Sequence, residues 1–311
     1  MEFFHKPTTF PFMATRKVWY GLSIIFMIVS IVSLSTHGLN LAIDFTGGVT
    51  VEATFPHTAD TDAVRRQLGA AGFRDPQVQN FGSSRDIAIR LPPDPHLNGA
   101  EIRAKVEQVL KSVDPGADIR SLDVVGPEVG GELERSAAWA LTFTLGGIFI
   151  YIAFRFHTWR LSLGAIVAVI HDPVLVLGIF SIDRTSFDLP VVAAVLAVVG
   201  YSLNDTVVVF DRIRERFHAN RRLPSPQVLD QSINQTLSRT IMTKVVTAIV
   251  VVALLVLGGQ ALRGFSEALL IGIIAGTYSS IYISSAIALD CGLTAEHIFP
   301  TVKKTAVDNM P

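Results

Sequence analysis

Gly200-Tyr201-Ser202-Leu203-Asn204-Asp205-Thr206-Val207-Val208-Val209-Phe210 closes an apolar run that starts at Leu189 and is long enough to cross a lipid bilayer. Asp205 lies inside this run, beside Asn204 and about one helical turn after Tyr201. A carboxylate at this depth costs about 2.5–3.5 kcal/mol on insertion scales, and chains keep one mainly where it carries ions or protons. The stretch therefore predicts a membrane span that contains a functional site.

Further apolar runs of this kind occur along the chain. Half of the 311 residues are hydrophobic and only 17% are charged, which is unusual for a soluble domain. No small-residue cleavage site follows the first run, so we expect a retained first helix rather than a signal peptide. The fifth run is short unless its helix begins near Ser238. The sequence predicts a polytopic α-helical membrane protein with six transmembrane helices, at 18–35, 137–154, 161–182, 189–210, 245–258 and 265–289.

Basic residues predict the orientation of these helices. Lys and Arg gather in both tails, at 155–160 and at 212–222, whereas the alternate short loops carry only Arg184 and Arg263. By the positive-inside rule, both tails are cytoplasmic. The predicted divisions are a cytoplasmic tail 1–17, transmembrane helix 1 at 18–37, an extracytoplasmic (periplasmic) domain 38–132, transmembrane helices 2–6 at 133–290 with a cytoplasmic loop 211–240, and a cytoplasmic tail 291–311.

The outer segment 38–132 has the pattern of a compact α+β domain. Its periodicity predicts, in order, a strand at 43–55 bent at Gly47-Gly48, a helix at 61–71, hairpin strands at 76–81 and 86–91, a helix at 100–113 and a strand at 117–125. This β-α-β-β-α-β order predicts a ferredoxin-like domain. In the cytoplasmic loop, Ser225-Pro226 resembles a helix N-cap followed by proline, and it predicts an amphipathic helix at the interface that leads into the fifth span.

Asp205 and the opening of the fifth span form the main candidate site. Asn204 and Tyr201 accompany the acid, and Arg239 opens the next apolar segment with a polar stripe that includes Thr243. A buried carboxylate that alternates between ionised and protonated forms would couple ion flow to conformation. A fixed salt bridge that only specifies packing is the alternative. Lys244 is expected to be an interfacial anchor that points outward.

His171-Asp172-Pro173 places a second ionisable pair in the middle of the third span. A proton relay and a polar kink bonded within the bundle are both consistent with this pattern. Glu267 lies near the outer end of the sixth span and is expected to be interfacial.

Two glycine-containing segments connect the outer domain to the membrane. Asp44, Gly47 and Gly48 follow the first span, and Gly126, Pro127 and Gly130 precede the second. We expect both segments to act as joints between the domain and the bundle. The first is not a nucleotide-binding loop, because it lacks the GxGxxG pattern and a following helix.

The rest of the sequence argues against several function classes. The chain has no metal-ligand cluster, nucleophilic triad or P-loop, so we expect no enzyme activity, no cofactor and no ATP hydrolysis on this chain. A net charge of −1 argues against a nucleic-acid surface. The single cysteine, Cys291, cannot form an internal disulfide.

Several motifs of this chain resemble those of the SecF family of bacterial Sec-translocon accessory subunits, within the RND superfamily, and they occur in the same order as in that family. They cover roughly residues 20–290 and are Ile43-Asp44-Phe45-Thr46-Gly47-Gly48, Val125-Gly126-Pro127-Glu128-Val129-Gly130, His171-Asp172, the segment from Gly200 to Glu215, Leu237-Ser238-Arg239-Thr240 and Gly276-Thr277-Tyr278-Ser279-Ser280.

The resemblance implies a multi-pass protein of the bacterial inner membrane with an RND-like arrangement of six spans and a ferredoxin-like periplasmic domain. It implies SecD as obligate partner, with SecYEG, SecA, YidC and YajC as further partners. It also implies that the proton motive force drives export of unfolded precursor polypeptides after the SecA step. The family's essential aspartate and arginine fall on Asp205 and Arg239. The coupling ion, H⁺ or Na⁺, stays open.

One departure and two alternatives accompany the resemblance. Several relatives have small or polar residues where this chain has Lys244, which would compete with Arg239 for Asp205 if it pointed inward. A small-solute RND exporter half is one alternative, although 90 or so outer residues leave little room for a substrate cleft. A translocon or insertase scaffold that moves no protons is the other.

Overall fold

The computed structural model describes residues 8–81, 83–94, 97–156, 158–259 and 262–299. Six helices in it are long and apolar enough to cross a membrane, which confirms the six predicted spans. They are α1 (Arg16–Thr36), α5 (Pro127–Arg155), α6 (Trp159–Asp183), α7 (Leu189–Ala219), α8 (Ser225–Leu257) and a sixth span made of α9 (Arg263–Tyr278), a π-helical segment η3 (Ser279–Ser284) and α10 (Ser285–Asp290). Parts of the predicted tails, at 1–7 and 300–311, lie outside the described residues.

Several helices continue beyond the apolar run that predicted them. The fifth span begins far upstream of Val245, at Ser225, so the predicted amphipathic segment is the first part of α8. Its N-cap is Pro224, one residue before the predicted Ser225. The chain before α1, which includes the short η1 (Phe12–Ala14), lies against this part of α8, because the Met13 amide donates to Asp230 Oδ1 over 2.8 Å. A last short helix, α11 (Ala295–Ile298), follows the sixth span.

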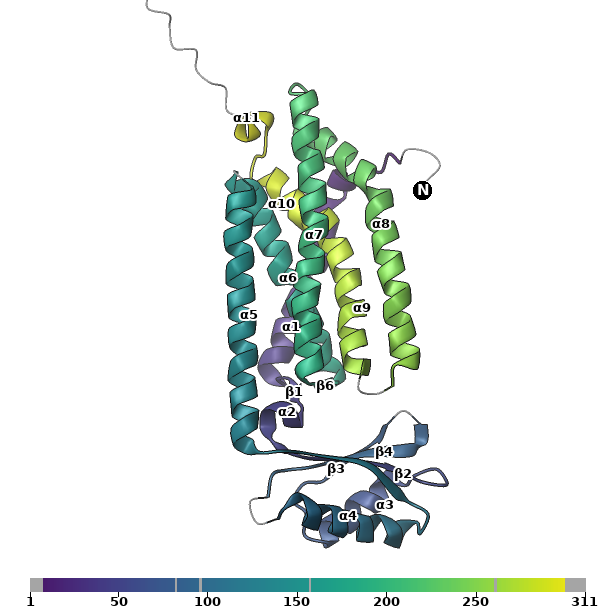
Figure 1. The fold of residues 1–311 in the computed structure, drawn as a ribbon. Coiled ribbons are helices and arrows are strands. Elements are labelled where there is room, and N and C mark those ends of the chain that lie inside the picture. Colours follow the sequence, from purple (N-terminus) through teal and green to yellow (C-terminus); the bar gives the residue numbers. More distant parts are fainter. Residues whose placement is uncertain (1–7, 82, 95–96, 157, 260–261, 300–311) are drawn as a thin grey trace, which may run out of the picture.

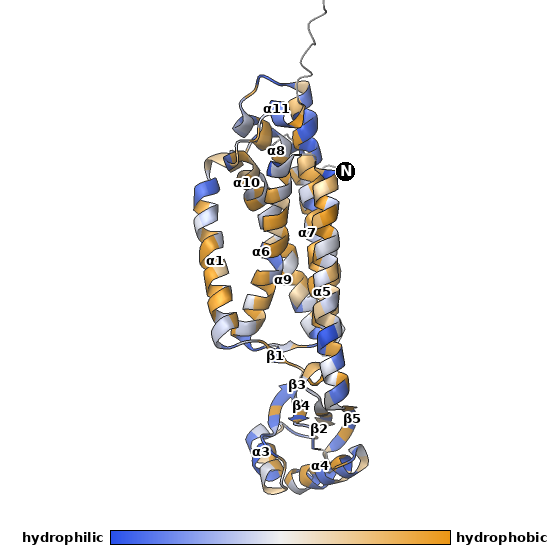
Figure 2. Ribbon diagram, turned by 90° about the vertical axis from the view of Figure 1, so that its left-hand side faces the viewer, coloured by the Kyte–Doolittle hydropathy of each residue, from blue (hydrophilic) through white to orange (hydrophobic). Residues whose placement is uncertain are grey.

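The six spans differ in how much of their surface is buried within the chain. In α6, α7 and the sixth span, 56%, 56% and 61% of the most apolar window is buried, against 17%, 11% and 17% in α1, α5 and α8. Figure 2 shows that α1, one of the exposed helices, is mainly hydrophobic along its length. The first group therefore forms the centre of the bundle, and the second presents apolar faces to lipid or to other proteins.

The bundle contains two apolar cores, one at each end. The core nearer the α/β domain includes Phe180, Val191 and Val195, and the core at the opposite end, here the tail end, includes Phe156, Phe210 and Phe217. Buried polar side chains interrupt this packing. His171, Asp172 and Ser279 lie between the two cores along the chain, whereas Ser202 and Asp205 lie among the α7 residues Val199, Leu203 and Val209 of the tail-end core. The bundle therefore contains a polar layer with apolar packing on both sides.

The α/β domain lies at one end of the bundle and contains the predicted succession of elements (Figure 1). These are β2 (Gly48–Thr54), α3 (Thr61–Ala70), β3 (Gln77–Phe81), β4 (Ser83–Leu91), α4 (Gly99–Val113) and β5 (Asp118–Val125). The sheet order is β3-β4-β2-β5, and each neighbouring pair is antiparallel. Alternate residues such as Val51 and Ile89 are fully buried with Val64 and Val106, so α3 and α4 cover one face of the sheet.

The start of the first predicted strand is a correction. Residues Ile43–Thr46 form a short helix, α2, and the strand begins only at Gly48. The Gly47 amide bonds to the Ile43 carbonyl, and Gly47 and Gly48 have φ angles of 69° and 130°. Only glycine adopts these angles easily, so the glycine pair ends a helical turn instead of bending a strand.

The joint between domain and bundle is closely packed. Strand β1 (Asn40–Leu41) pairs in parallel with β6 (Ser186–Phe187), which connects the end of α1 to the loop before α7. Gly126 is the N-cap of α5, so the predicted joint residues Pro127 and Gly130 lie in the first turn of one continuous helix. A Cβ on Gly130 would lie 2.8 Å from the Phe45 carbonyl oxygen, so α5 packs directly on α2.

Gly130→Ala is expected to destabilise this joint by about 1–3 kcal/mol, because the added methyl group meets backbone that cannot move aside easily. The matched control is Gly131→Ala, where a Cβ meets no atom within 4 Å. That change should stabilise the helix by about 0.5–1 kcal/mol. Thermal unfolding of the two variants in the same detergent measures the difference, and equal melting temperatures would contradict the close approach of α2 and α5.

Candidate functional site

Asp205 forms a buried ion pair in the polar layer. Its Oδ2 lies 2.7 Å from Nζ of Lys244 on α8. Both residues are only 5% exposed, so water cannot solvate either charge freely. A buried charge is stable only with a partner, and removing one member of such a pair typically costs about 3–5 kcal/mol.

Tyr201 completes the surroundings of the pair. The Lys244 ammonium lies 4.1 Å from the centre of the Tyr201 ring, which is a cation–π distance. The Tyr201 hydroxyl lies 2.9 Å from the Thr243 carbonyl oxygen and 2.7 Å from Thr247 Oγ1. Tyr201 therefore connects α7 to α8 and covers the side of the ammonium that Asp205 leaves open.

The prediction that Lys244 points outward is wrong. Lys244 lies four residues after Thr240 and eight after Thr236, and both threonines are buried. Residues with this spacing share one face of a helix. This spacing was present in the sequence. The positive-inside rule nevertheless assigns the lysine to the membrane interface, because the rule contains no information on how a helix is rotated about its axis.

Arg239 is the predicted partner of Asp205 that the structure places elsewhere. Five residues separate it from Lys244, which is a rotation of about 140° around α8, so both cannot face the same acid. Arg239 is exposed, and within the described residues it forms no ion pair.

Of the other two predicted members of the site, one contributes to it and one does not. Asn204 is exposed on α7 and points away from the pair. Thr243 takes part through its backbone carbonyl, whereas its hydroxyl donates to the Thr240 carbonyl of its own helix. The structure therefore brings together Asp205, Tyr201 and the Thr243 backbone, adds Lys244, and leaves out Arg239 and Asn204.

Asp172 is a second buried carboxylate and lies on the other side of α7. It is fully buried, and its Oδ1 lies 2.9 Å from Nδ1 of His171. Its Oδ2 accepts hydrogen bonds from the hydroxyls of Ser202 on α7 and Ser279, the latter over 2.8 Å. Asp172 thus connects α6, α7 and the sixth span through one carboxylate.

The sixth span changes its winding at this level. Ser279 begins the π-helical segment η3, and Ser279, Ser280 and Ser284 are completely buried. Such segments are rare and frequently occur at functional sites. The sequence analysis does not predict this feature, although the segment belongs to the motif Gly276-Thr277-Tyr278-Ser279-Ser280.

His171 keeps one nitrogen without a partner. Its Nε2 is buried and makes no hydrogen bond to any described residue, and its ring lies 5.9 Å from the Tyr278 ring. The relay and the structural interpretation of His171-Asp172 both agree with this geometry. Among the described residues, no three or more His, Cys, Asp and Glu side chains form a group suited to a metal ion.

The predicted joint residues lie together at the domain end of α7. Asp44 Oδ2 accepts from the Leu189 amide at 3.0 Å, in the first turn of that helix, and Asp188 caps the same turn through Val191. Arg90 of β4 donates to Ser186 Oγ over 2.7 Å. Burial raises the pKa of Asp188 and lowers the pKa of Arg90, while Asp188 and Asp44 oppose the shift of Arg90.

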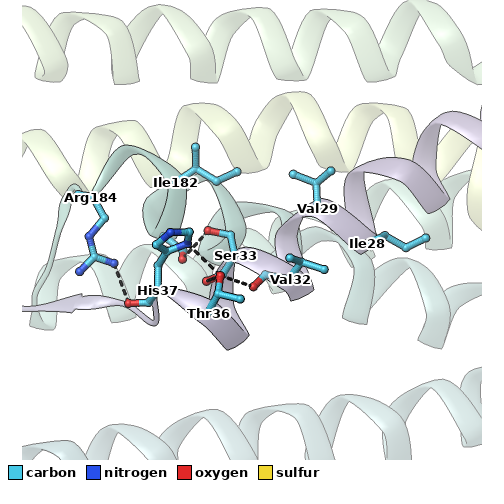
Figure 3. Close-up of a pocket in the computed structure, with 9 residues that line it drawn as sticks. Ile28, Val29, Val32, Ser33, Thr36, His37, Ile182 and Arg184 are labelled. Carbon is cyan, nitrogen blue, oxygen red and sulfur yellow. Dashed lines mark hydrogen bonds between the residues drawn. The ribbon is translucent and has the colours of Figure 1, made fainter.

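A cavity of about 480 Å³ lies beside this joint, between the ends of α1 and α6. Arg184 and His37 are at one end of it, and Ile28 and Val29 are at the other (Figure 3). The Arg184 guanidinium donates to the carbonyl oxygens of His37 and Gly38 and so ties the two helix ends together. The lining combines four aliphatic side chains with five polar or charged ones and contains neither buried carboxylate, so this cavity is separate from the ion pair.

Asp172→Ala is expected to lower the free energy of unfolding by about 3 kcal/mol, because it leaves His171, Ser202 and Ser279 without their shared acceptor. Asp183→Ala, at the exposed end of the same helix, is the control and should change little. Thermal unfolding in lipid nanodiscs measures both. An Asp172→Ala protein that unfolds like the parent but loses ion-dependent activity would favour the relay interpretation over the structural one.

Comparison with known proteins gives a consistent result. The family model "Protein export membrane protein SecD/SecF, C-terminal" matches residues 105–294, and the "SecD/SecF GG Motif" matches residues 32–55. The protein translocase subunit SecF of Pseudomonas aeruginosa is 44% identical over 308 residues, which are 98% of this chain and 99% of that protein.

Two solved structures have a similar fold. The SecDF structure from Thermus thermophilus, described as a translocon-associated membrane protein, superposes with a TM-score of 0.83 at 37% identity. SecDF in a "Super-membrane-facing form" superposes with a TM-score of 0.69 at 36% identity. The matches cover 91% and 93% of this chain but only 39% of either solved chain.

Proposed function

Because this chain belongs to the SecF family of protein translocase subunits, we propose that it uses the proton motive force to promote export of precursor proteins. The observation that carries the proposal is the Asp205–Lys244 pair, a titratable buried carboxylate that apolar core residues flank on both sides along α7. Protonation of Asp205 removes the attraction that holds α7 to α8 at this point. The chain itself breaks no covalent bond and needs no cofactor in this proposal.

The energy of one proton is sufficient for such a step. A charge that crosses 100 mV releases about 2.3 kcal/mol. A difference of one pH unit adds about 1.4 kcal/mol. Together these shift a two-state equilibrium by more than a hundredfold, which is enough to bias the position of a domain.

Helix α7 is the element that carries the change to the domain. Asp44 bonds to its first residue, Leu189, and Asp205 lies 16 residues later, which is about 24 Å along a helix. A rigid helix transmits a tilt over this distance, so repacking at Asp205 moves the anchor of Asp44 and with it the joint at Gly47, Gly48 and Gly130. The different TM-scores of the two SecDF forms at nearly equal identity are consistent with movement between domains.

The remaining features of the proposal follow from the family. The chain works in the bacterial inner membrane with SecD as its partner, and with SecYEG, SecA, YidC and YajC at the translocon. Both tails are cytoplasmic, and the α/β domain is periplasmic, ferredoxin-like, and in contact with emerging polypeptide. The arrangement of the six spans is RND-like. The exposed apolar faces of α1, α5 and α8 are suited to lipid and to the SecD half.

Asp205→Asn is expected to abolish the part of precursor translocation that depends on the proton motive force, because the amide cannot exchange a proton at physiological pH. Translocation of a secretory precursor into inverted membrane vesicles, with and without an ionophore, measures this. Asp183→Asn is the matched control at an exposed site on α6. Unchanged force-dependent export by a correctly assembled Asp205→Asn complex would contradict the motor function and favour the scaffold alternative.

Restraining the joint should have the same effect without altering the ion pair. Arg90 and Ser186 touch across the domain and the bundle, so cysteines at both positions accept a short cleavable cross-linker in a Cys291→Ser background. We expect cross-linking to remove the force-dependent step and cleavage of the linker to restore it. Either single cysteine with the same reagent is the control. Full activity in the linked form would exclude movement at this joint.

A further inference from the structure

We infer that Lys244 makes the site specific for protons, because its ammonium fills the position beside Asp205 that a sodium ion would need. The inference rests on the proposed ion-coupling role of Asp205 and deepens it by assigning the coupling ion. Lys244 is thus a specificity-determining residue of the site.

The geometry around Lys244 Nζ resembles an occupied cation site. The ammonium lies 2.7 Å from Asp205 Oδ2 and 4.1 Å from the centre of the Tyr201 ring. Asp205 contributes the anionic oxygen and Tyr201 the electron-rich face, so the position is favourable for one positive charge. Lys244 and Asp205 are both buried, so the ammonium is held at this position away from bulk water.

A sodium ion could enter only if the ammonium left. Two cations at this separation in a buried site would repel each other strongly. A proton has no such requirement, because it binds a carboxylate oxygen directly and needs neither space nor further ligands.

Other charged groups near the pair support the same conclusion. On α8, Arg239 adds a second positive charge towards the tail end of the helix. From the α6 side, Asp172 is already engaged with His171, Ser202 and Ser279 and does not face Asp205. The charged groups that act on Asp205 are therefore cationic, namely Lys244 in direct contact and Arg239 from another face of α8, and they disfavour a further metal cation.

The inference predicts that removal of the lysine charge opens a sodium site. We expect Lys244→Ser to leave Asp205 with a neutral oxygen neighbour, and Lys244→Arg to keep the position filled. The measurement is equilibrium binding of radioactive sodium to the full chain in lipid nanodiscs, for each protein with and without Asp205→Asn. The difference within each pair is the sodium bound through Asp205.

The expected result has three parts. The parent and Lys244→Arg show no Asp205-dependent sodium binding, and Lys244→Ser binds several-fold more sodium than its Asp205→Asn double variant. Lys17→Ser, at an exposed lysine in the first turn of α1, behaves like the parent. Lys244→Gln repeats the neutral substitution with a longer side chain if the serine variant does not assemble. Asp205-dependent sodium binding by the parent, or none in either neutral variant, would overturn the inference.

Binding and translocation give separate answers. Sodium binding needs no precursor and no translocon, so it tests the role of Lys244 even if Asp205→Asn leaves export unchanged. The converse outcome is a parent chain that binds sodium through Asp205 while export still requires an ion gradient. That result would support the motor function but identify sodium, not the proton, as the coupling ion.

Discussion

A carboxylate shielded from water must be paired, hydrogen-bonded or protonated, and helix α7 carries one such group and contacts a second. Asp205, on α7 itself, pairs with Lys244 of α8, while Asp172 of α6 reaches α7 through Ser202. These contacts fix the rotation of α7 and the position of three neighbouring spans. Apolar packing above and below supplies most of the burial but little specificity, since lipid-facing and protein-facing aliphatic residues are chemically alike.

Features that depend on neighbouring residues in the sequence are predictable from it, whereas contacts between distant segments are not. The spans follow from the length of apolar runs, and the acid at Asp205 stands out because its local cost is high. The partner of that acid could not be chosen in the same way. Arg239 and Lys244 are both cations near one end of a span, and only the packing of α8 on α7 decides which one faces inward. The positive-inside rule describes the average position of a lysine, and Lys244 departs from it.

The same distinction applies to the joint with the α/β domain. The order of strands and helices follows from periodicity, but the turn at Ile43–Thr46 depends on the left-handed angles of Gly47 and Gly48. The close approach of Gly130 to the Phe45 carbonyl joins segments far apart in the chain, so no local pattern reveals it. The motifs at both segments were nevertheless recognisable, because glycine is required where two backbones meet.

The exposed position of Asn204 has a consequence for the life of the protein in the cell. Its amide lies on the outer surface of α7, within the apolar part of a span. Before assembly this group faces hydrocarbon and lacks a suitable hydrogen-bonding partner, which is unfavourable. An unassembled copy therefore exposes a polar group within the bilayer, and this group becomes buried once another helix covers it. Such a group is a chemical difference that membrane quality control could use to distinguish an orphan subunit from a completed complex.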